Sequence, residues 1–188
     1  MSLNITLMNF IIFIASAIYF IIPCLSNSAP VLFRKLNFLN YPVDFNKKLN
    51  SKPIFGKNKT FRGFFFGILT GIVIVGIQTL LYQFPVFKII SLIPYNQINF
   101  VLLGFLYGFG CLFGDLVESF VKRRFNIKPG GIFFPWDQLD LLIGALIFVS
   151  ITYVPPIEII VFLIIAVPIF HIAFNYLGYY LGLQKEKW

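Results

Sequence analysis

Long apolar segments alternate with two polar, basic segments along the 188-residue chain. A helix rises 1.5 Å per residue, so about 20 apolar residues cross the roughly 30 Å hydrocarbon core of a bilayer. The pattern therefore predicts an all-α integral membrane protein that forms a single polytopic domain over residues 1–188. The five expected transmembrane helices cover residues 5–25, 61–83, 98–121, 137–154 and 157–183, and the two polar loops cover residues 26–60 and 122–136.

Basic residues fall almost entirely on one side of this predicted topology. Residues 26–62 contain eight of the fifteen Lys and Arg residues, residues 122–128 contain four and the tail contains two, which leaves Lys88 alone on the other side. The positive-inside rule places loops rich in Lys and Arg in the cytoplasm. We therefore expect the N-terminus outside, the C-terminus inside and both polar loops in the cytoplasm.

Glycines recur at a spacing of four residues on two of the expected helices. The second helix carries Gly63, Gly67 and Gly71, and the third carries Gly104, Gly108, Gly110 and Gly114. Small residues at this spacing let two membrane helices approach closely. The stripes therefore predict a close-packed helix pair.

Acidic side chains interrupt the apolar pattern at the end of the third expected helix and the start of the fourth. Four polar residues with the spacing i, i+3, i+4 and i+7 share one face of the third helix: Asp115, Glu118, Ser119 and Lys122. A charge inside a membrane helix costs roughly 2.5–3.5 kcal/mol on insertion scales, which favours a functional use of the two acids. Asp137 and Asp140 share a face of the next helix, where Asp137 could instead serve as a helix cap.

A basic stretch precedes the second expected helix. It places Lys57, Lys59, Thr60 and Arg62 around a glycine, without the GxxxxGK[ST] spacing of a Walker A loop. Helix N-termini present free N–H groups and a positive dipole end, so they bind anions readily. The same residues also suit a juxtamembrane loop that contacts anionic lipid, and both interpretations stay open.

This inventory favours phosphoryl or nucleotidyl transfer over acyl transfer. Mg²⁺ prefers carboxylate oxygens and water, and usually keeps substrate phosphate oxygens as ligands. The candidate ligands are Asp115, Asp137 and Asp140, with Glu118 as an addition. Lys122 and Arg123 are expected to hold a phosphate chain. Ser119 has no nearby His to act as a base, so we expect a hydrogen-bonding role for it rather than a nucleophilic one.

The order of these motifs resembles the signature of CTP:phosphatidate cytidylyltransferases, SxxKRxxxxKD…DRxD. Pro129 stands where that signature has Asp, Gln138 stands where it has Arg, and its HGG element is absent. These departures resemble the archaeal branch, the CDP-archaeol synthases. The similar elements are Pro42-Val43-Asp44, Lys59-Thr60-Phe61-Arg62-Gly63, Gly114-Asp115 with Ser119-Phe120-Val121-Lys122-Arg123-Arg124, Lys128-Pro129-Gly130 and Asp137-Gln138-Leu139-Asp140.

The resemblance implies a multi-pass enzyme of the cell membrane with five transmembrane helices. It implies Mg²⁺-dependent transfer of CMP from CTP to a lipid phosphate, unsaturated archaetidic acid, with release of pyrophosphate. The lipid chains would lie in a groove open to the bilayer, along the glycine stripes. Nucleic acid is not an expected partner, and the sequence leaves the oligomeric state open.

The resemblance also implies residue roles by position. The catalytic group would comprise Asp115, Asp137, Asp140 and Lys122, with the three aspartates holding Mg²⁺; Lys59, Arg62, Lys122 and Arg123 would bind phosphates; Asn58, Thr60 and Ser119 would orient the nucleotide. Two alternatives remain open: a phosphatidate cytidylyltransferase that uses ester lipids, and a small-solute transporter. No internal repeat is evident and the charges cluster at one end of the spans, which favours an enzyme over a transport path.

Overall fold

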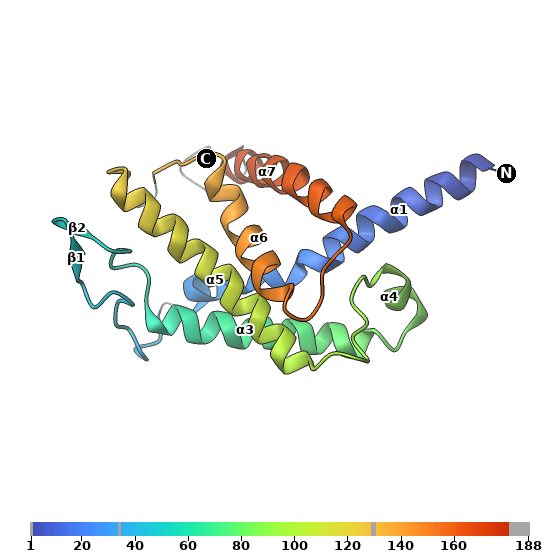
Figure 1. The fold of residues 1–188 in the computed structure, drawn as a ribbon, viewed down its shortest axis with the longest axis horizontal. Helices are drawn as coiled ribbons and strands as arrows, with labels where there is room; N and C mark the ends of the chain where they lie inside the picture. Colours follow the sequence, from blue (N-terminus) through green and yellow to red (C-terminus); the bar gives the residue numbers. More distant parts are fainter. Residues whose placement is uncertain (1, 34, 129–130, 181–188) are drawn as a thin grey trace.

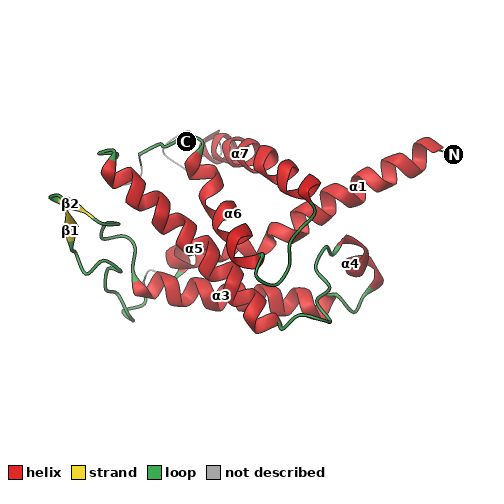
Figure 2. Ribbon diagram, viewed as in Figure 1, coloured by secondary structure: helices red, strands yellow, loops and turns green. Residues whose placement is uncertain are grey.

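The computed structural model describes residues 2–33, 35–128 and 131–180 (Figure 1). Pro129 and Gly130 of the Lys128-Pro129-Gly130 element and the basic C-terminal tail lie outside the described residues. The chain is helical apart from its loops and one small hairpin (Figure 2). The elements are α1 (Ser2–Ile21), the 3₁₀ helix η1 (Ile22–Ser28), α2 (Ala29–Leu32), β1 (Lys48–Leu49), β2 (Lys52–Pro53), α3 (Phe61–Leu81), α4 (Pro85–Ile90), α5 (Phe100–Arg124), α6 (Trp136–Val149) and α7 (Ile157–Tyr180).

Within the described residues, three helical segments are long and apolar enough to cross a membrane: Met8–Leu32, Phe61–Leu81 and Phe100–Arg124. A stripe of exposed apolar side chains runs along α3 through Phe65, Leu69, Val73, Ile77 and Leu80. Exposed apolar surface of this extent marks contact with lipid or another partner. The protein is therefore a multi-pass helical membrane protein.

Some element boundaries differ from those that the hydropathy pattern predicts. The expected fourth span, residues 137–154, is helical only over Trp136–Val149, whose 14 residues extend about 21 Å. Turns at residues 150–152 end this helix before the Pro155-Pro156 pair. The segment between the second and third expected spans, residues 84–97, contains a short helix, α4, which begins at Pro85. Proline is well suited to the first turn of a helix because its missing N–H would have no partner there.

α5 lies at the centre of the fold and packs against both α3 and α6 (Figure 1). A Cβ added at Gly71 would lie 2.6 Å from the carbonyl oxygen of Gly104, and one added at Gly108 would lie 2.7 Å from Cα of Ile68. Only glycine allows this backbone approach, so the predicted close-packed helix pair is confirmed as α3 with α5. Gly71, Gly104 and Gly108 face the other helix of this pair, so lipid chains cannot lie along that part of the stripes, whereas Gly110 and Gly114 face α6.

Buried polar groups join the end of α1 to α3 and α5. The Tyr107 hydroxyl on α5 is fully buried and donates to the carbonyl of Phe20 at 2.9 Å. The buried Gln78 side chain on α3 donates to the carbonyl of Tyr19 at 2.8 Å and accepts from the Tyr95 hydroxyl at 2.9 Å. Buried polar groups with partners give a specific alignment, so these bonds fix the end of α1 against α3 and α5.

The loop that leads to α3 folds back on itself. Residues 41–43 pair with residues 59–61, with the Val43 amide donating to the Lys59 carbonyl at 2.8 Å. Between them the antiparallel hairpin β1–β2 places Lys48 opposite Pro53. The hairpin lies at the end of the molecule where α3 begins and α5 ends (Figure 1).

Candidate active site

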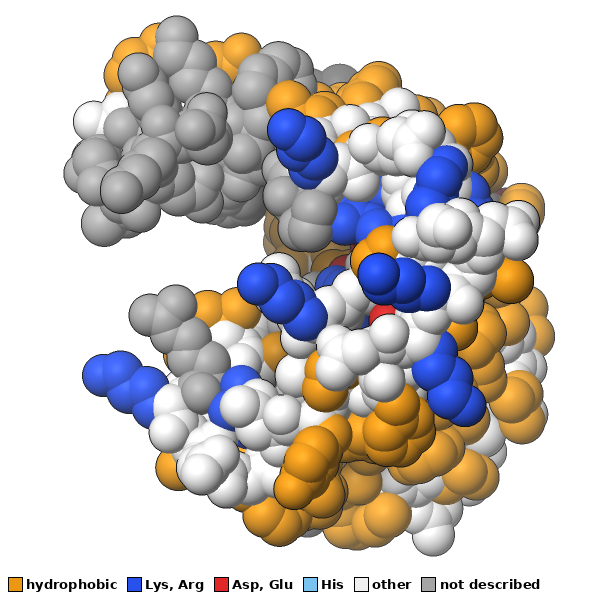
Figure 3. Space-filling view, turned by 90° about the vertical axis from the view of Figure 1, so that its left-hand side faces the viewer, with side chains coloured by type: hydrophobic (Ala, Val, Ile, Leu, Met, Phe, Trp, Pro, Cys, Tyr) orange, Lys and Arg blue, Asp and Glu red, His pale blue; other side chains and the backbone are white. Residues whose placement is uncertain are grey.

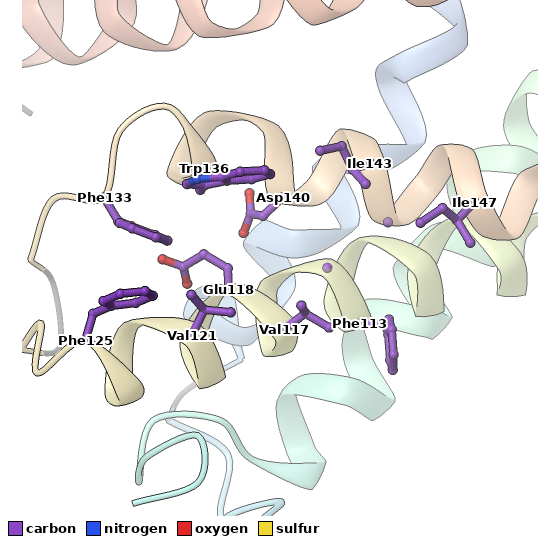
Figure 4. Close-up of a pocket in the computed structure, with 12 residues that line it drawn as sticks. Phe113, Val117, Glu118, Val121, Phe125, Phe133, Trp136, Asp140, Ile143 and Ile147 are labelled. Atoms are coloured by element: carbon purple, nitrogen blue, oxygen red, sulfur yellow. The ribbon is translucent and has the colours of Figure 1, made fainter. Parts of the chain in front are cut away.

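Three carboxylates from two helices meet where α5 and α6 cross. One oxygen each from Asp115, Glu118 and Asp140 lies within 4.8 Å of the others, and we call these three residues the acid cluster. Glu118 and Asp140 carry their oxygen atoms into the space between the two helices (Figure 4). Asp140 is partly shielded from solvent, and Glu118 is only 9% exposed. Like charges this close require a compensating cation or shared proton.

Glycine contacts at the helix crossing bring the cluster together. A Cβ added at Gly114 would overlap the carbonyl oxygen of Asp140 and would lie 2.8 Å from the carbonyl carbon of that residue. A Cβ at Gly110 would lie 2.7 Å from the carbonyl oxygen of Gly144. The backbones of α5 and α6 are therefore in direct contact beside Asp115, which sets the separation of its carboxylate from that of Asp140.

Lys122 lies between two carboxylates on different helices. Its ammonium group is 2.5 Å from Glu118 Oε1 and 2.7 Å from Asp137 Oδ1. Asp137 therefore pairs with Lys122, and the described acid cluster has Glu118 in its place beside Asp115 and Asp140. The N-cap of α6 is Pro135, and Asp137 accepts the Phe133 amide at 2.9 Å instead of serving as the cap.

Lys59 reaches the acid cluster from the loop before α3. Its ammonium group lies 2.6 Å from Asp115 Oδ2. Thr60, the next residue, caps α3 by accepting the Gly63 amide at 3.2 Å. Arg62 lies away from this contact and donates to the carbonyl of Leu36 at 2.6 Å. The basic stretch expected to bind phosphate is thus divided between a cluster contact, a helix cap and a loop contact.

A polar cavity of about 190 Å³ lies above the acid cluster, between the 55–59 segment and α5. Figure 3 shows Lys and Arg side chains around a hollow in this end of the molecule, with acidic atoms inside it. Of the residues expected to contact the nucleotide, Asn58, Lys59, Ser119 and Arg123 line this cavity, and so does Lys122. Thr60 and Arg62 do not line it.

An apolar cavity of about 570 Å³ lies on the other side of Glu118, between α5 and α6 (Figure 4). Aromatic and aliphatic side chains form its wall: Phe113, Val117, Val121, Phe125, Phe133, Trp136, Ile143 and Ile147. Glu118 and Asp140 are its acidic lining residues, and Glu118 also lines the polar cavity. A charged compartment and an apolar compartment therefore meet at the acid cluster.

The donor set of the acid cluster fits a hard divalent cation. Mg²⁺ binds carboxylate oxygens and often shares its remaining positions with phosphate oxygens and water. Asp115 has Lys59 as its basic partner and Glu118 has Lys122, but Asp140 has no Lys or Arg within 4.0 Å in the described part of the chain. The cluster therefore has negative charge available for a cation, beside a cavity lined by other cations.

Two residues to which sequence reasoning gave no role bind the backbone of the loop before α3. Asp44 is 5% exposed and accepts the amides of Asn46, Phe55 and Gly56 at 2.9–3.0 Å. Burial acts to raise the pKa of this carboxyl, but the amide donors outweigh it and lower the pKa below its ordinary value. Arg124 donates to the carbonyl groups of the β1–β2 hairpin. In the sequence, the only indication of a role for Asp44 and Arg124 is that both lie within elements of the family resemblance, Pro42-Val43-Asp44 and Ser119–Arg124.

The fold and the two-compartment site define a class, the intramembrane enzymes. A solved structure described as an intramembrane enzyme for archaeal membrane lipids biosynthesis superposes with a TM-score of 0.61 and 26% sequence identity, covering 85% of this chain and 92% of that chain. The sequence model of the CarS-like family, described as CDP-archaeol synthase, matches residues 8–188. The chain belongs to the CDP-archaeol synthase family.

Relatives with that name cover almost the whole chain. The CDP-archaeol synthase of Archaeoglobus fulgidus is 36% identical over 182 residues, which are 93% of this chain and 98% of that protein. The CDP-archaeol synthase of Methanococcus maripaludis is 36% identical over 186 residues, covering 96% of this chain and 100% of that protein. The family resemblance of the sequence motifs is therefore confirmed.

Proposed function

We propose that the protein is a membrane-embedded CTP:lipid-phosphate cytidylyltransferase that makes CDP-archaeol. It transfers CMP from CTP to unsaturated archaetidic acid and releases pyrophosphate, with Mg²⁺ as the cofactor. The observation that carries the proposal is the position of the acid cluster between a cation-lined polar cavity and an apolar cavity. A water-soluble triphosphate and a lipid tail need two such compartments that share one reactive centre.

The proposed reaction is an in-line displacement at the α-phosphorus of CTP. An oxygen of the lipid phosphate forms a new bond to that phosphorus, and the bond from it to the oxygen that bridges to the β-phosphorus breaks. Pyrophosphate leaves with this oxygen, so no protein nucleophile is required. Catalysis then rests on positioning and on electrostatic stabilisation of the phosphate oxygens.

The basic residues of the polar cavity suit the triphosphate. Arg123 lines the cavity, is only 8% exposed, and its buried Nε has no hydrogen-bond partner among the described residues. A planar guanidinium of this kind binds phosphate oxygens in bidentate fashion. Lys59 and Lys122 contribute ammonium groups that the acid cluster already orients. Asn58 and Ser119 line the same cavity and are proposed to orient the nucleotide.

Asp115, Glu118 and Asp140 are the proposed Mg²⁺ ligands. Asp137 is proposed to act on the metal site through Lys122, to which it is paired. When bound, the ion would neutralise charge on the phosphate oxygens and align the two substrates. The lipid chains are proposed to occupy the apolar cavity, which places the lipid phosphate next to Glu118 and Asp140.

The topology proposed for this function has five transmembrane helices in the cell membrane. The N-terminus lies outside and the hairpin end lies in the cytoplasm, because the basic residues gather at that end. CTP and Mg²⁺ would then reach the polar cavity directly, and the lipid would enter from the bilayer.

Pyrophosphate release by the purified protein in detergent tests the proposal. Four nucleoside triphosphates are each paired with an ether-linked and an ester-linked lipid phosphate, with Mg²⁺ or with a chelator. We expect release only with CTP, lipid phosphate and Mg²⁺ together, and a higher kcat/KM for the unsaturated ether lipid. A higher kcat/KM for the ester lipid would identify a phosphatidate cytidylyltransferase instead, and no release from folded protein would refute cytidylyl transfer.

A further inference from the structure

The 55–59 segment carries three polar side chains of the polar cavity, Lys57, Asn58 and Lys59, and its Phe55 ring contacts Phe120 on α5 with 6.3 Å between the ring centroids. Only Lys59 of these three makes an ion pair with α5 among the described residues. Gly56 precedes the two exposed residues Lys57 and Asn58 and has a φ of 105°, a conformation that favours glycine. Besides the Phe55–Phe120 contact, hydrogen bonds must therefore fix where the polar side chains of this segment lie.

Asp44 holds one end of this segment. Its Oδ2 accepts the amides of Phe55 and Gly56, both at 3.0 Å, while Oδ1 accepts the amide of Asn46 at 2.9 Å. These three amides flank the β1–β2 hairpin, so one carboxylate closes the hairpin at its base. No Lys or Arg lies within 4.0 Å of this buried carboxylate in the described residues, although the loop is strongly basic. Its hydrogen-bonding capacity is directed to the backbone.

The other end of the 55–59 segment is held by Val43, the residue before Asp44. The Val43 amide donates to the Lys59 carbonyl at 2.8 Å, within the pairing of residues 41–43 with residues 59–61. The segment is thus fixed at Phe55–Gly56 and again at Lys59, both times by the turn at residues 43–44. A shift at Asp44 would move Lys59 relative to Asp115.

Arg124 ties the hairpin to α5. Its guanidinium donates to the carbonyls of Leu49 at 2.9 Å, Lys52 at 3.4 Å and Pro53. The Lys52 ammonium donates back to the Arg124 carbonyl at 3.0 Å. The guanidinium also lies over the Phe120 ring, 5.1 Å from its centroid. Arg124 does not line the polar cavity, and its two terminal NH₂ groups donate to hairpin carbonyls, whereas the adjacent Arg123 lines the cavity.

From these contacts we infer that Asp44 and Arg124 are positioning residues for the nucleotide. Together they clamp the hairpin and hold the 55–59 segment over the acid cluster, and this sets the affinity of the polar cavity for the triphosphate. Neither residue contacts the reacting atoms. This inference rests on the proposed function, because it assigns the clamp to CTP rather than to the lipid.

Two near-isosteric or charge-conserving variants test the clamp. Asp44→Asn replaces one acceptor oxygen with an NH₂ group that faces backbone N–H donors. Arg124→Lys keeps the charge, but a single ammonium group cannot span three carbonyls as the guanidinium does. Lys47→Gln is the matched control, since it removes an exposed charge from the same hairpin without touching the side-chain contacts described above.

We expect Asp44→Asn and Arg124→Lys each to raise the KM for CTP about tenfold, with the KM for lipid phosphate and kcat at saturating CTP nearly unchanged. Lys47→Gln should leave all three constants unchanged. Amide hydrogen exchange should accelerate at Phe55 and Gly56 in Asp44→Asn, while peptides from α5 keep their wild-type protection.

Faster exchange at residues 55–56 with an unchanged KM for CTP would overturn the inference, because an ordered segment would then be irrelevant to nucleotide affinity. Unchanged exchange would overturn it as well, since Asp44 would not hold the segment. Equal losses for CTP and lipid phosphate would indicate a general structural role and reject the assignment. Wild-type protein without CTP turnover would instead refute the proposed function, and the exchange experiment would still show whether Asp44 orders the segment.

Discussion

The crossing of α5 and α6 at Gly114 sets the geometry of the acid cluster, so Gly114→Ala should damage catalysis more than folding. The added methyl group would overlap the Asp140 carbonyl oxygen and lie 2.8 Å from the Asp140 carbonyl carbon. Carbon and oxygen atoms normally approach no closer than about 3.3 Å, even in weak C–H···O contacts. The two helices must therefore separate by about 1 Å at the residue that precedes Asp115.

Gly114→Ala should change the stability of the protein little and its activity strongly. Alanine favours a helix over glycine by about 1 kcal/mol, whereas overpacking a tight contact costs about 1–3 kcal/mol. The net destabilisation should be about 0–2 kcal/mol, which a folded membrane protein can tolerate. A misplacement of about 1 Å between catalytic groups can cost roughly 100-fold in rate. We therefore expect kcat to fall roughly 100-fold while the protein still inserts and purifies as wild type does.

Gly76→Ala is the matched control on α3. A Cβ there would lie 3.5 Å from the Phe100 ring, an ordinary van der Waals contact far from the acid cluster. This variant should keep wild-type turnover and gain stability from its helix propensity. Turnover is measured by pyrophosphate release and stability by thermal unfolding in the same detergent. Wild-type kcat in a folded Gly114→Ala protein would refute the claim that this crossing sets the catalytic geometry.

Two further predictions concern the metal site and the lipid site. Asp140→Asn removes a proposed metal ligand, so kcat should fall by roughly 100-fold or more and the dependence of kcat on Mg²⁺ should flatten. The control Glu158→Gln changes an exposed acid at the start of α7 and should alter neither kcat nor its Mg²⁺ dependence. Normal turnover of Asp140→Asn in a Mg²⁺ titration would contradict the assignment. Val117→Trp narrows the apolar cavity and should raise the KM for long-chain lipid phosphate roughly tenfold, with the KM for CTP unchanged. The control Val73→Trp, on the exposed stripe of α3, should leave both KM values unchanged. Equal kinetics of the two variants would argue against lipid in this cavity.

Much of the site could be predicted because it depends on spacing within one helix. Asp115, Glu118 and Lys122 share a face at 3.6 residues per turn, and the structure shows the Lys122–Glu118 pair that this spacing allows. Glycine stripes predicted a close helix approach for a similar reason, since a four-residue repeat defines one face. The basic stretch marked Lys59 as a candidate phosphate ligand, the family resemblance implied Asn58 as a nucleotide contact, and both line the polar cavity.

Roles that depend on contacts between distant segments could not be read in this way. Two aspartates three residues apart gave no reason to separate Asp137, which pairs with Lys122, from Asp140, which joins the acid cluster. Arg62 lies in a basic motif that suits phosphate binding, yet it donates to the backbone carbonyl of Leu36 in the folded loop. Such partners are set by loop conformation, which charge and spacing do not encode.

The sequence by itself determined the long apolar helices in outline and the residue types that gather at one end, because these follow from hydropathy and helical periodicity. The tertiary structure alone decided that α6 crosses α5 at Gly114, and that this crossing separates a polar cavity from an apolar one. The physical reason is that a crossing point depends on how two complementary surfaces fit together. Local periodicity defines each surface but not the register in which they meet.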